Sequence, residues 1–354
     1  MSRQKASIIV TKYGKPEVGT RPVPIPQAKQ VLVKVTAAAV NPADWKAIEY
    51  GVLIDKFPAV SGNDGAGIIE SIGPEVAGLK QGDRVFFQGT FTQADRATFQ
   101  QYTLVDTEVL AKVPSNISDD QASTIPVASV TALFGLFEKS GIAFPKNGPT
   151  CWEVDPRAWR KLIGWTVWLV HLTILEHTTD RLLTTAIQLA RIAGFSPIAT
   201  TASAQHADFL ESLGATHVFD RDVDVKKVQG VFGSSISFIF DAVSIHSTQK
   251  LGTDIINSFN SSDAHFAMVE PLDSSLQEEL QGKATIHHVF AGTPDANKTL
   301  SVPYWQVLSK WIKEGKIVPN RVQVVGGGLE AVPEALELSK KGVSGVKLVV
   351  HPQE

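Results

Sequence analysis

A chain of 354 residues is long enough for two domains, each with its own core. Its hydrophobic content of 43% and charged content of 19% are ordinary for a globular protein, and a net charge of -3 excludes strongly basic binders of nucleic acid or anionic membranes. Cys151 is the only cysteine, which excludes an intramolecular disulfide and any zinc site with two thiolates. We therefore expect a reducing, cytoplasmic setting without nucleic-acid or membrane partners.

The chain shows no targeting or membrane-spanning pattern. The N-terminus MSRQKASIIV lacks the apolar stretch of a signal peptide. The longest near-apolar run, LIGWTVWLVHLTIL (162–175), has 14 residues interrupted by His171, which is short for a membrane span. We predict a buried element there.

The first 125 residues are rich in strand patterns. VLVKVTAAAV (31–40) and AGIIESIG (66–73) are apolar or alternating, and Gly and Pro separate them from their neighbours. From about residue 126 the pattern changes, because VASVTALFGLFEKSG (127–141) has the three- and four-residue apolar spacing of a helix. The N-terminal part is thus predicted to be mainly β.

Between about 186 and 292, short strands alternate with helices. AIQLARIAG (186–194) and QHADFLESLG (205–214) read as helices, the second ended by Gly214. The predicted strands are SPIATTAS (196–203), HVFD (217–220), ISFIFDAVS (236–244) and HHVFAGT (287–293). This βαβ pattern predicts a parallel sheet covered by helices. PYWQVLSKWIKEGK (303–316) then reads as an amphipathic helix and VSGVKLVV (343–350) as a strand.

The order of several short motifs resembles the medium-chain dehydrogenase/reductase superfamily, and in particular its zinc-independent enoyl and quinone reductases and the fungal trans-enoyl reductase-like group. The motifs are NPADWK (41–46), GNDGAGIIESIG (62–73), GDRV (82–85), PVASVTALFGLF (126–137), AIQLARIAG (186–194), LGATHVFD (213–220), FDAVS (240–244), GGLEAVPEALEL (327–338) and SGVKLVV (344–350). Each alone is weak, but the set in this order is specific.

The resemblance implies an α/β protein made of a GroES-like β-barrel domain and a Rossmann domain with a doubly wound parallel sheet. Residues 1–125 and 300–354 would form the GroES-like substrate and catalytic domain, and residues 126–299 the Rossmann NADP-binding domain. The active cleft would lie between them.

Zinc-dependent members carry a cysteine and a histidine ligand in the first third of the chain. The corresponding positions here resemble Asn41 to Asp44 and Asn63, and amides do not replace thiolate or imidazole on zinc with comparable affinity. His287 and His288 are adjacent, so they would point to opposite faces of a strand. We expect no metal.

Without a metal, another group must stabilise the enolate that forms when hydride adds to a conjugated alkene. Lys46 and Thr131 match family positions beside the nicotinamide. Lys46 would donate to the enolate oxygen, and Thr131 would hold the nicotinamide ribose or the carbonyl. The alternatives are a solvated lysine and a helix-start hydroxyl. Asn41 and Asp44 are interpreted as residues that order their turn.

The second predicted strand of the nucleotide domain, SPIATTAS, is followed by hydroxyls rather than by the carboxylate typical of NAD-specific sites. Thr200, Thr201 and Ser203 suit a 2′-phosphate, and Arg221 would add a cation. Ser203 alternatively caps the next helix. NADPH is favoured over NADH. The resemblance implies that cofactor contacts come from Thr131, Thr200, Thr201, Ser203, Arg221, Asp241, Ala242, Val243, Phe290, Ala291, Gly292 and Lys347.

An atypical segment lies at about 147–185. In the superfamily a glycine-rich turn precedes the AIQLARIAG helix, but no glycine occurs between Gly164 and Gly194, and the turn's last glycine position falls near Leu183. Glu176 and Asp180 would add negative charge beside a phosphate. The lost backbone contacts would cost about 3 kcal/mol, roughly a hundredfold in affinity.

Two explanations fit this segment, which holds four of the seven tryptophans and the only cysteine. We favour the explanation that intron-derived codons have been read as protein. The other is a divergent first strand, WTVWLVHLTIL (165–175), whose turn EHTTD starts the helix.

These patterns predict a zinc-independent, NADPH-dependent reductase of activated C=C bonds in an enoyl thioester, enone or quinone-like substrate, free or held on a carrier. The alternative is a catalytically impaired scaffold, or the product of a mispredicted gene model, that lacks the phosphate-binding turn. The chain would act as a monomer or a homodimer.

Overall fold

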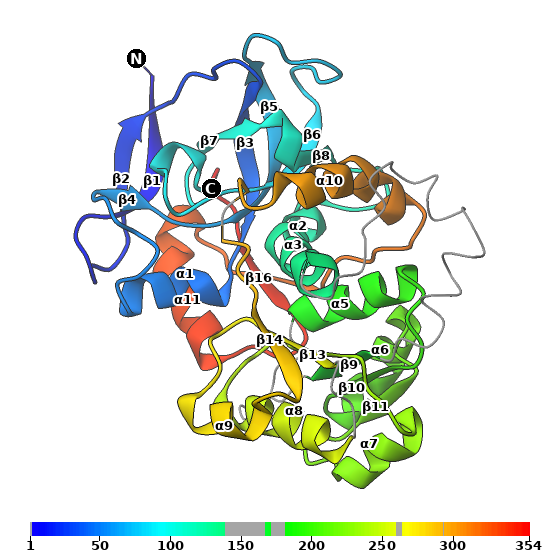
Figure 1. Ribbon diagram of the computed structural model, residues 1–354. Coiled ribbons are helices and arrows are strands. Elements are labelled where there is room, and N and C mark those ends of the chain that lie inside the picture. The colour runs from blue at the N-terminus through cyan, green and yellow to red at the C-terminus, as the bar shows by residue number, and fades with distance from the viewer. Residues whose placement is uncertain (1, 139–166, 171–180, 260–263, 293) are drawn as a thin grey trace. The chain divides into compact units, whose positions relative to one another are not determined.

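The computed structural model describes residues 2–138, 167–170, 181–259, 264–292 and 294–354 (Figure 1). The chain divides into two compact units. Unit 1 comprises Met1–Ala128, Ala291–Gly315 and Pro319–Glu354, and unit 2 comprises Ser129–Phe290 with Lys316–Val318. No helix among the described residues combines the length and the apolar character that a bilayer crossing requires.

Unit 1 contains two β-sheets. The smaller is antiparallel with the order β2-β1-β4, and the larger has the order β15-β16-β3-β5-β6-β8 with β7 paired to β3. The strands are β1 (Arg3–Ile9), β2 (Glu17–Pro22), β3 (Gln30–Ala39), β4 (Ala59–Val60), β5 (Asp64–Ile72), β6 (Arg84–Gln88), β7 (Tyr102–Asp106), β8 (Leu110–Lys112), β15 (Val322–Val324) and β16 (Lys347–Val350).

The long central strand β3 explains why this sheet curves around a core. Most of QVLVKVTAAA is buried, so side chains pack on both faces. Its antiparallel pairing with β5 shifts register between Leu32 and Val33 and again between Val35 and Ala37. Such irregularities bend a strand and increase its twist. The core inside the curve is made of apolar residues such as Val33, Val35, Ile69, Val85, Phe87, Leu348 and Val350.

Short helices complete unit 1, and they include one that the sequence patterns did not predict. Pro42 begins α1, and the Asp44 carboxylate accepts a hydrogen bond from the Asn41 backbone N–H at 2.7 Å. Asn41 and Asp44 therefore do order this segment, as the start of a helix rather than as a turn. The helices are α1 (Pro42–Glu49), η1 (Ala94–Arg96), η2 (Thr107–Val109), α2 (Asp119–Ser123), α10 (Lys298–Lys313), η7 (Gly328–Ala331) and α11 (Val332–Lys341).

Unit 2 is built on a fully parallel sheet with the order β11-β10-β9-β12-β13-β14. Counted along the chain this is 3-2-1-4-5-6, the order of the doubly wound dinucleotide-binding sheet, in which the direction of winding reverses between β9 and β12. The predicted Rossmann architecture is confirmed. The strands are β9 (Val167–Val170), β10 (Ile198–Thr201), β11 (His217–Phe219), β12 (Phe238–Asp241), β13 (Ala264–Met268) and β14 (Ala284–His288).

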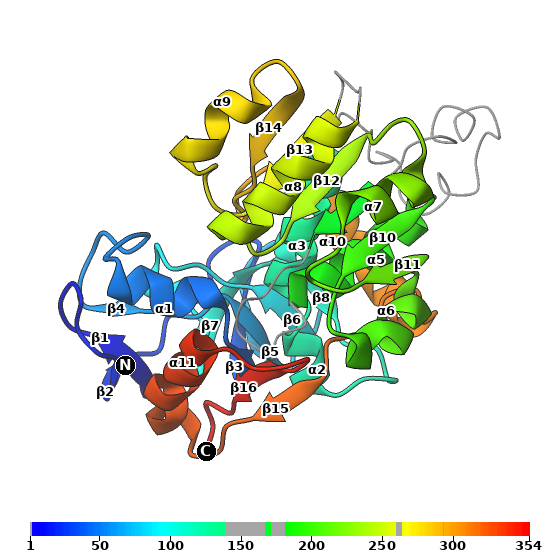
Figure 2. The ribbon, with the colours of Figure 1, turned by 90° about the horizontal axis from the view of Figure 1, so that it is seen from below.

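Helices pack against this sheet, and α8 lies along β12 and β13 in Figure 2. Gly252 permits that close approach, because a Cβ at this position would lie 2.5 Å from Cζ of Phe266. The helices are α3 (Pro126–Leu133, which begins in unit 1), the π-helical η3 (Phe134–Glu138), α5 (Arg181–Ile192), η5 (Ala204–His206), α6 (Ala207–Leu213), α7 (Val225–Phe232), α8 (His246–Ser258), η6 (Ser274–Leu276) and α9 (Gln277–Leu280).

Three element predictions need correction. The strand expected at 287–293 is wrong in position, because β14 ends at His288. This edge strand is largely exposed and lacks an apolar pattern, whereas the apolar residues Val289 and Ala291 are buried after the strand has ended. The helix expected at 303–316 begins at Lys298, with Pro303 inside it. Strand β13 was not predicted.

His351, just after β16, gives unit 1 a pH-dependent contact. Partial burial lowers its pKa, but hydrogen bonds to Glu354 and Asp120, both at 2.9 Å, outweigh burial and raise the pKa above 6.5. The protonated form therefore stabilises the fold below pH 6.5, and this contribution disappears as the pH rises through the raised pKa. We expect His351→Asn to lower stability by up to about 1 kcal/mol in mild acid and by less in alkali. Melting temperatures across that range would test this, and a difference independent of pH would contradict it.

Candidate functional site

A fully buried charged cluster lies in unit 1 where β5, β16 and the start of α1 meet. Lys347 Nζ donates to an Asp64 carboxylate oxygen and, at 3.1 Å, to Asn41 Oδ1. Asn41 Nδ2 donates to Asp64 at 2.9 Å, and the Val127 backbone N–H donates to the other oxygen of Asp64 at 2.7 Å. Lys347 and Asp64 are 0% exposed. The sequence separation of 283 residues explains why no local pattern paired them.

Lys46 lies in α1, half-buried, with Nζ 5.8 Å from the ring centroid of Trp45. A second ammonium, that of Lys340, lies 5.9 Å from the same ring and pairs with Glu49. Contact with an aromatic ring stabilises a cation. The role of Lys46 as a donor to the enolate oxygen stays a prediction.

Thr131 lies in unit 2 as the sixth residue of α3, half-buried. Its interpretation as a helix-start hydroxyl is therefore wrong, because the helix begins at Pro126. Its proposed contacts with ribose or carbonyl stay a prediction.

Two residues predicted for a 2′-phosphate, Ser203 and Arg221, follow the carboxyl ends of β10 and β11, whereas Thr200 and Thr201 are the last two residues of β10. Arg221 donates from its guanidinium to Ser203 Oγ. Ser203 precedes η5 but makes no side-chain capping bond there, so the capping alternative is wrong. Thr200 and Thr201 are fully buried, and Thr200 Oγ1 has no hydrogen-bond partner in the described part of the chain. A hydroxyl and a guanidinium are groups that bind phosphate, and their contact with a 2′-phosphate stays a prediction.

Asp241, at the end of β12, organises the loop that follows it. Its carboxylate accepts from the backbone N–H groups of Val243 at 3.0 Å and Ser244 at 2.8 Å, and from Thr248 Oγ1 at 2.5 Å. Asp241 and Ala242 are buried, and Val243 is half-buried. The carboxylate thus shapes the loop, and the backbone of residues 241–243 stays predicted to contact the cofactor.

Two side chains that sequence reasoning did not connect hold the segment after β14. Gln88 Nε2 donates to the Ala291 carbonyl at 2.5 Å, and Asn63 Nδ2 donates to the Gly292 carbonyl at 3.2 Å. Phe290, directly before them, is 48% exposed. Gln88 carried no signal in the sequence, because its partner lies 203 residues away.

The positions that resemble those of the zinc ligands carry amides in this chain. Asn41 is hydrogen-bonded to Lys347 and Asp64, and Asn63 Nδ2 donates to the Gly292 carbonyl. Amides bind zinc more weakly than thiolate or imidazole does, and the expectation of no metal stays a prediction. Within the described ranges, no group of three or more His, Cys, Asp or Glu side chains is placed to hold a metal ion.

The expected phosphate-binding turn, with Glu176 and Asp180, lies outside the described residues. Val167–Val170 forms a central strand inside the range that the divergent-strand explanation assigned. Leu183 is the third residue of α5 and is fully buried in unit 2. The effect of the missing glycines on cofactor affinity stays a prediction.

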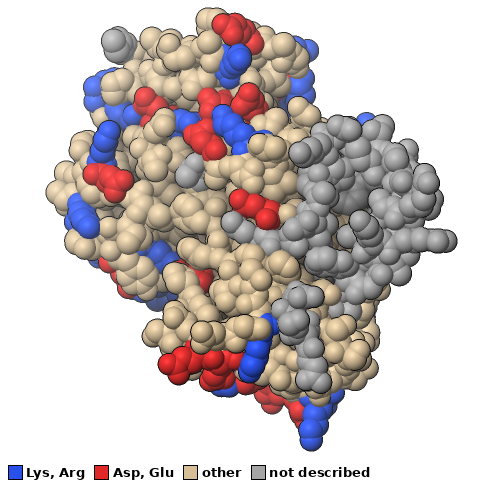
Figure 3. Space-filling view, in the orientation of Figure 1, with Lys and Arg blue, Asp and Glu red and all other residues tan. Residues whose placement is uncertain are grey.

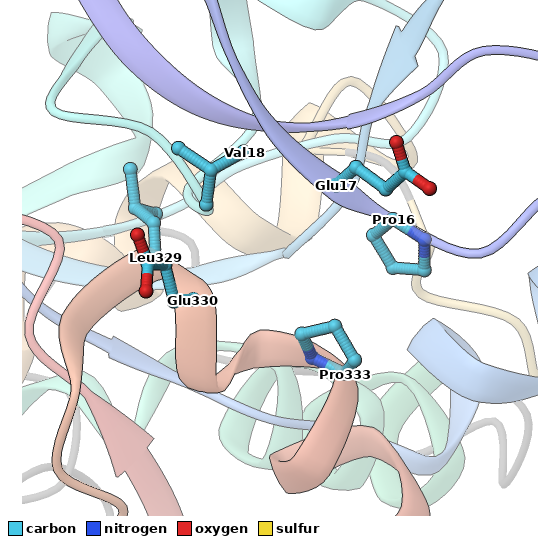
Figure 4. Close-up of a pocket in the computed structure, with 6 residues that line it drawn as sticks. All are labelled: Pro16, Glu17, Val18, Leu329, Glu330 and Pro333. Carbon is cyan, nitrogen blue, oxygen red and sulfur yellow. The ribbon is translucent and has the colours of Figure 1, made fainter.

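A pocket of about 280 Å³ in unit 1 is lined by none of the predicted site residues but by Pro16, Glu17, Val18, Leu329, Glu330 and Pro333 (Figure 4). On the face shown in Figure 3, basic and acidic side chains are interspersed, and large areas carry neither.

Known proteins resemble this chain along its whole length. Residues 27–115 match the alcohol dehydrogenase GroES-like domain, and residues 184–261 match the zinc-binding dehydrogenase domain. The trans-enoyl reductase tndF of Aspergillus flavipes is 30% identical over 381 residues, covering 99% of each chain. The dehydrogenase azaJ of Aspergillus niger is 30% identical, covering 98% of each chain.

Solved structures share the fold. A putative zinc-dependent alcohol dehydrogenase from Rhizobium etli superposes with a TM-score of 0.78 at 21% identity, covering 99% of this chain and 98% of that one. The quinone oxidoreductase of Coxiella burnetii has a TM-score of 0.68 at 20% identity, with 98% and 99% covered. The doubly wound sheet, the GroES-like match and the full-length relatives together identify the chain as an enoyl-reductase-like oxidoreductase that belongs to the medium-chain dehydrogenase/reductase superfamily.

Proposed function

We propose that this protein is a zinc-independent, NADPH-dependent reductase of activated C=C bonds. The observation that carries the proposal is that Asn41 and Asn63, at positions resembling those of the zinc ligands in zinc-dependent relatives, are buried amides hydrogen-bonded to Lys347 and to the Gly292 carbonyl. Alcohol oxidation in those relatives relies on a metal to polarise oxygen, whereas a conjugated alkene needs only a donor at its carbonyl oxygen. Relatives named trans-enoyl reductases support the reduction of a C=C bond.

The residues of this chain would bind the substrate and stabilise its charge. NADPH, when bound, supplies the hydride that forms the new C–H bond at the β-carbon. The electron pair of the C=C bond moves toward the carbonyl oxygen, where Lys46 would donate a hydrogen bond to the enolate. A proton from solvent or a nearby donor then completes the α-carbon. Thr131 would hold the carbonyl or the nicotinamide ribose.

Unit 1 would supply the substrate-binding surface, and unit 2 most of the cofactor contacts. We assign residues 1–125 and 300–354 to the former role and residues 126–299 to the latter. The substrate would be a small enoyl or quinone-like molecule, free or carried by a partner, and the protein a cytoplasmic monomer or homodimer. The single cysteine supports a reducing compartment.

The preference for NADPH is proposed from the pairing of Ser203 with Arg221. We expect Arg221→Ala to weaken NADPH binding about tenfold to a hundredfold while leaving NADH binding unchanged, because only the 2′-phosphate needs the charge-assisted hydrogen bond. Calorimetric titration with both cofactors measures this. Lys227→Ala, which removes an exposed charge from the same unit, is the control. Equal losses for both cofactors in Arg221→Ala would contradict the assignment.

The absence of glycine between Gly164 and Gly194 favours a second candidate, a scaffold that binds dinucleotide weakly or not at all. Titration with NADPH, followed by tryptophan fluorescence, separates the two. Saturation at micromolar cofactor would remove the scaffold, and no response at millimolar cofactor would remove the enzyme for this chain. Sequencing the transcript across codons 146–186 tests the gene-model explanation directly.

A further inference from the structure

Two buried side-chain amides of unit 1 donate hydrogen bonds to the segment that follows β14. Gln88 Nε2 and Asn63 Nδ2 donate to the successive carbonyls of Ala291 and Gly292, at 2.5 and 3.2 Å. Gln88 is 2% exposed and Asn63 is 1% exposed. Since only the nitrogen of a side-chain amide can donate to a carbonyl, these contacts fix the orientation of both amides.

In this arrangement the oxygen atoms of both amides lack hydrogen-bond partners among the described residues, which destabilises the fold. Gln88 Oε1 and Asn63 Oδ1 are buried without a hydrogen-bond partner in the described part of the chain. A buried acceptor without a partner destabilises a fold, so each such group calls for an explanation. Hydrophobic side chains would fill the same space without that penalty, but they could not hold a carbonyl in place.

The segment itself lies where a parallel sheet binds its ligand. Dinucleotides bind beyond the carboxyl ends of the strands in doubly wound sheets, and Val289–Gly292 follow the carboxyl end of β14. The Val289 backbone N–H still bonds the Met268 carbonyl at 2.7 Å, at the end of β13. Ala291 and Gly292, which belong to unit 1, are held by the two amides of the same unit.

We propose that Gln88 and Asn63 are positioning residues for the cofactor: they set the backbone of Ala291 and Gly292, and through it the surface that the nicotinamide half of NADPH contacts. This proposal rests on the proposed function. It assigns no contact between either amide and the reacting atoms, because both act through the backbone they hold.

Gln88→Glu tests the proposal, because an ionised carboxylate cannot donate to the Ala291 carbonyl whereas a protonated one can. We expect the Kd for NADP+, measured by calorimetry, to rise about tenfold at pH 8 relative to the wild type at the same pH. The deficit should shrink as the pH falls toward about 5.5, since burial raises the pKa of a carboxyl introduced there. Gln88→Met, which has no donor at any pH, should bind NADP+ weakly at every pH.

A matched control separates positioning from general destabilisation. Gln100 is also a fully buried glutamine of unit 1, and its Nε2 donates to the carbonyls of Ala94 and Ala97 at 2.7 and 2.9 Å. Arg21 donates to Gln100 Oε1 at 2.6 Å, so a carboxylate in Gln100→Glu keeps a charged partner, and this variant should leave the Kd for NADP+ unchanged. If Gln88→Glu fails to fold, Asn63→Asp tests the donation to the Gly292 carbonyl by the same measurement of Kd against pH.

The outcomes are distinct. An unchanged Kd in folded Gln88→Glu at pH 8, or a weakening that acid does not relieve, would overturn the positioning role. A tenfold weakening that acid relieves, with Gln100→Glu unaffected, would support it. Wild-type protein that binds no NADP+ would instead remove the proposed function, and the inference with it.

Discussion

Replacing Lys347 with methionine is expected to lower the free energy of unfolding by about 3–5 kcal/mol, the range observed when one partner of a buried ion pair is removed. Lys347 and Asp64 are both 0% exposed, so water cannot compensate the carboxylate that remains. Methionine keeps the length of the side chain, which limits the contribution of a cavity. Urea unfolding followed by circular dichroism measures the change.

A double-variant cycle shows whether the charge pair is the cause. Asp64→Asn combined with Lys347→Met leaves no buried charge, while Asn41 and the Val127 backbone still surround residue 64. We expect the double variant to be more stable than Lys347→Met alone by about 1–3 kcal/mol, the coupling typical of contacting residues. Additive losses would mean that the two charges do not depend on each other.

Replacing Lys46 with alanine is expected to lower kcat about a hundredfold to a thousandfold, the range found when one donor to a developing oxyanion is removed. The affinity for NADPH should change far less, because the ammonium is proposed to act on the substrate's carbonyl oxygen. Steady-state reduction of a short enoyl-CoA thioester gives kcat, and cofactor titration gives the affinity.

Lys340→Ala provides the matched control for this prediction. Its ammonium lies over the same Trp45 ring, at 5.9 Å against 5.8 Å for Lys46, so both variants remove a cation from the same aromatic ring. Lys340→Ala should leave kcat within about twofold of the wild type. Equal losses of kcat in the two variants, or equal losses of kcat and NADPH affinity in Lys46→Ala, would contradict a specific role for Lys46.

Periodicity predicted those elements whose own residues carry the signal. SPIATTAS and ISFIFDAVS contain β10 and β12, whose residues are all buried, as expected for strands of a parallel sheet covered on both faces. Strand β14 was displaced, since an exposed edge strand lacks an apolar pattern. Helix α1 was missed because NPADWKAIE is short, and its first turn depends on a contact between the Asp44 side chain and the Asn41 backbone.

The sequence by itself determined the superfamily, the alternation of strands and helices, and the residue types available at the zinc positions. Each of these depends only on the order and spacing of residues along the chain. The tertiary structure alone decided which distant groups meet. It joined Lys347 to Asp64 and Gln88 to the Ala291 carbonyl. The physical reason is that burial and partner choice for a polar side chain depend on the sheet register and loop path, and these are set by packing across tens to hundreds of residues.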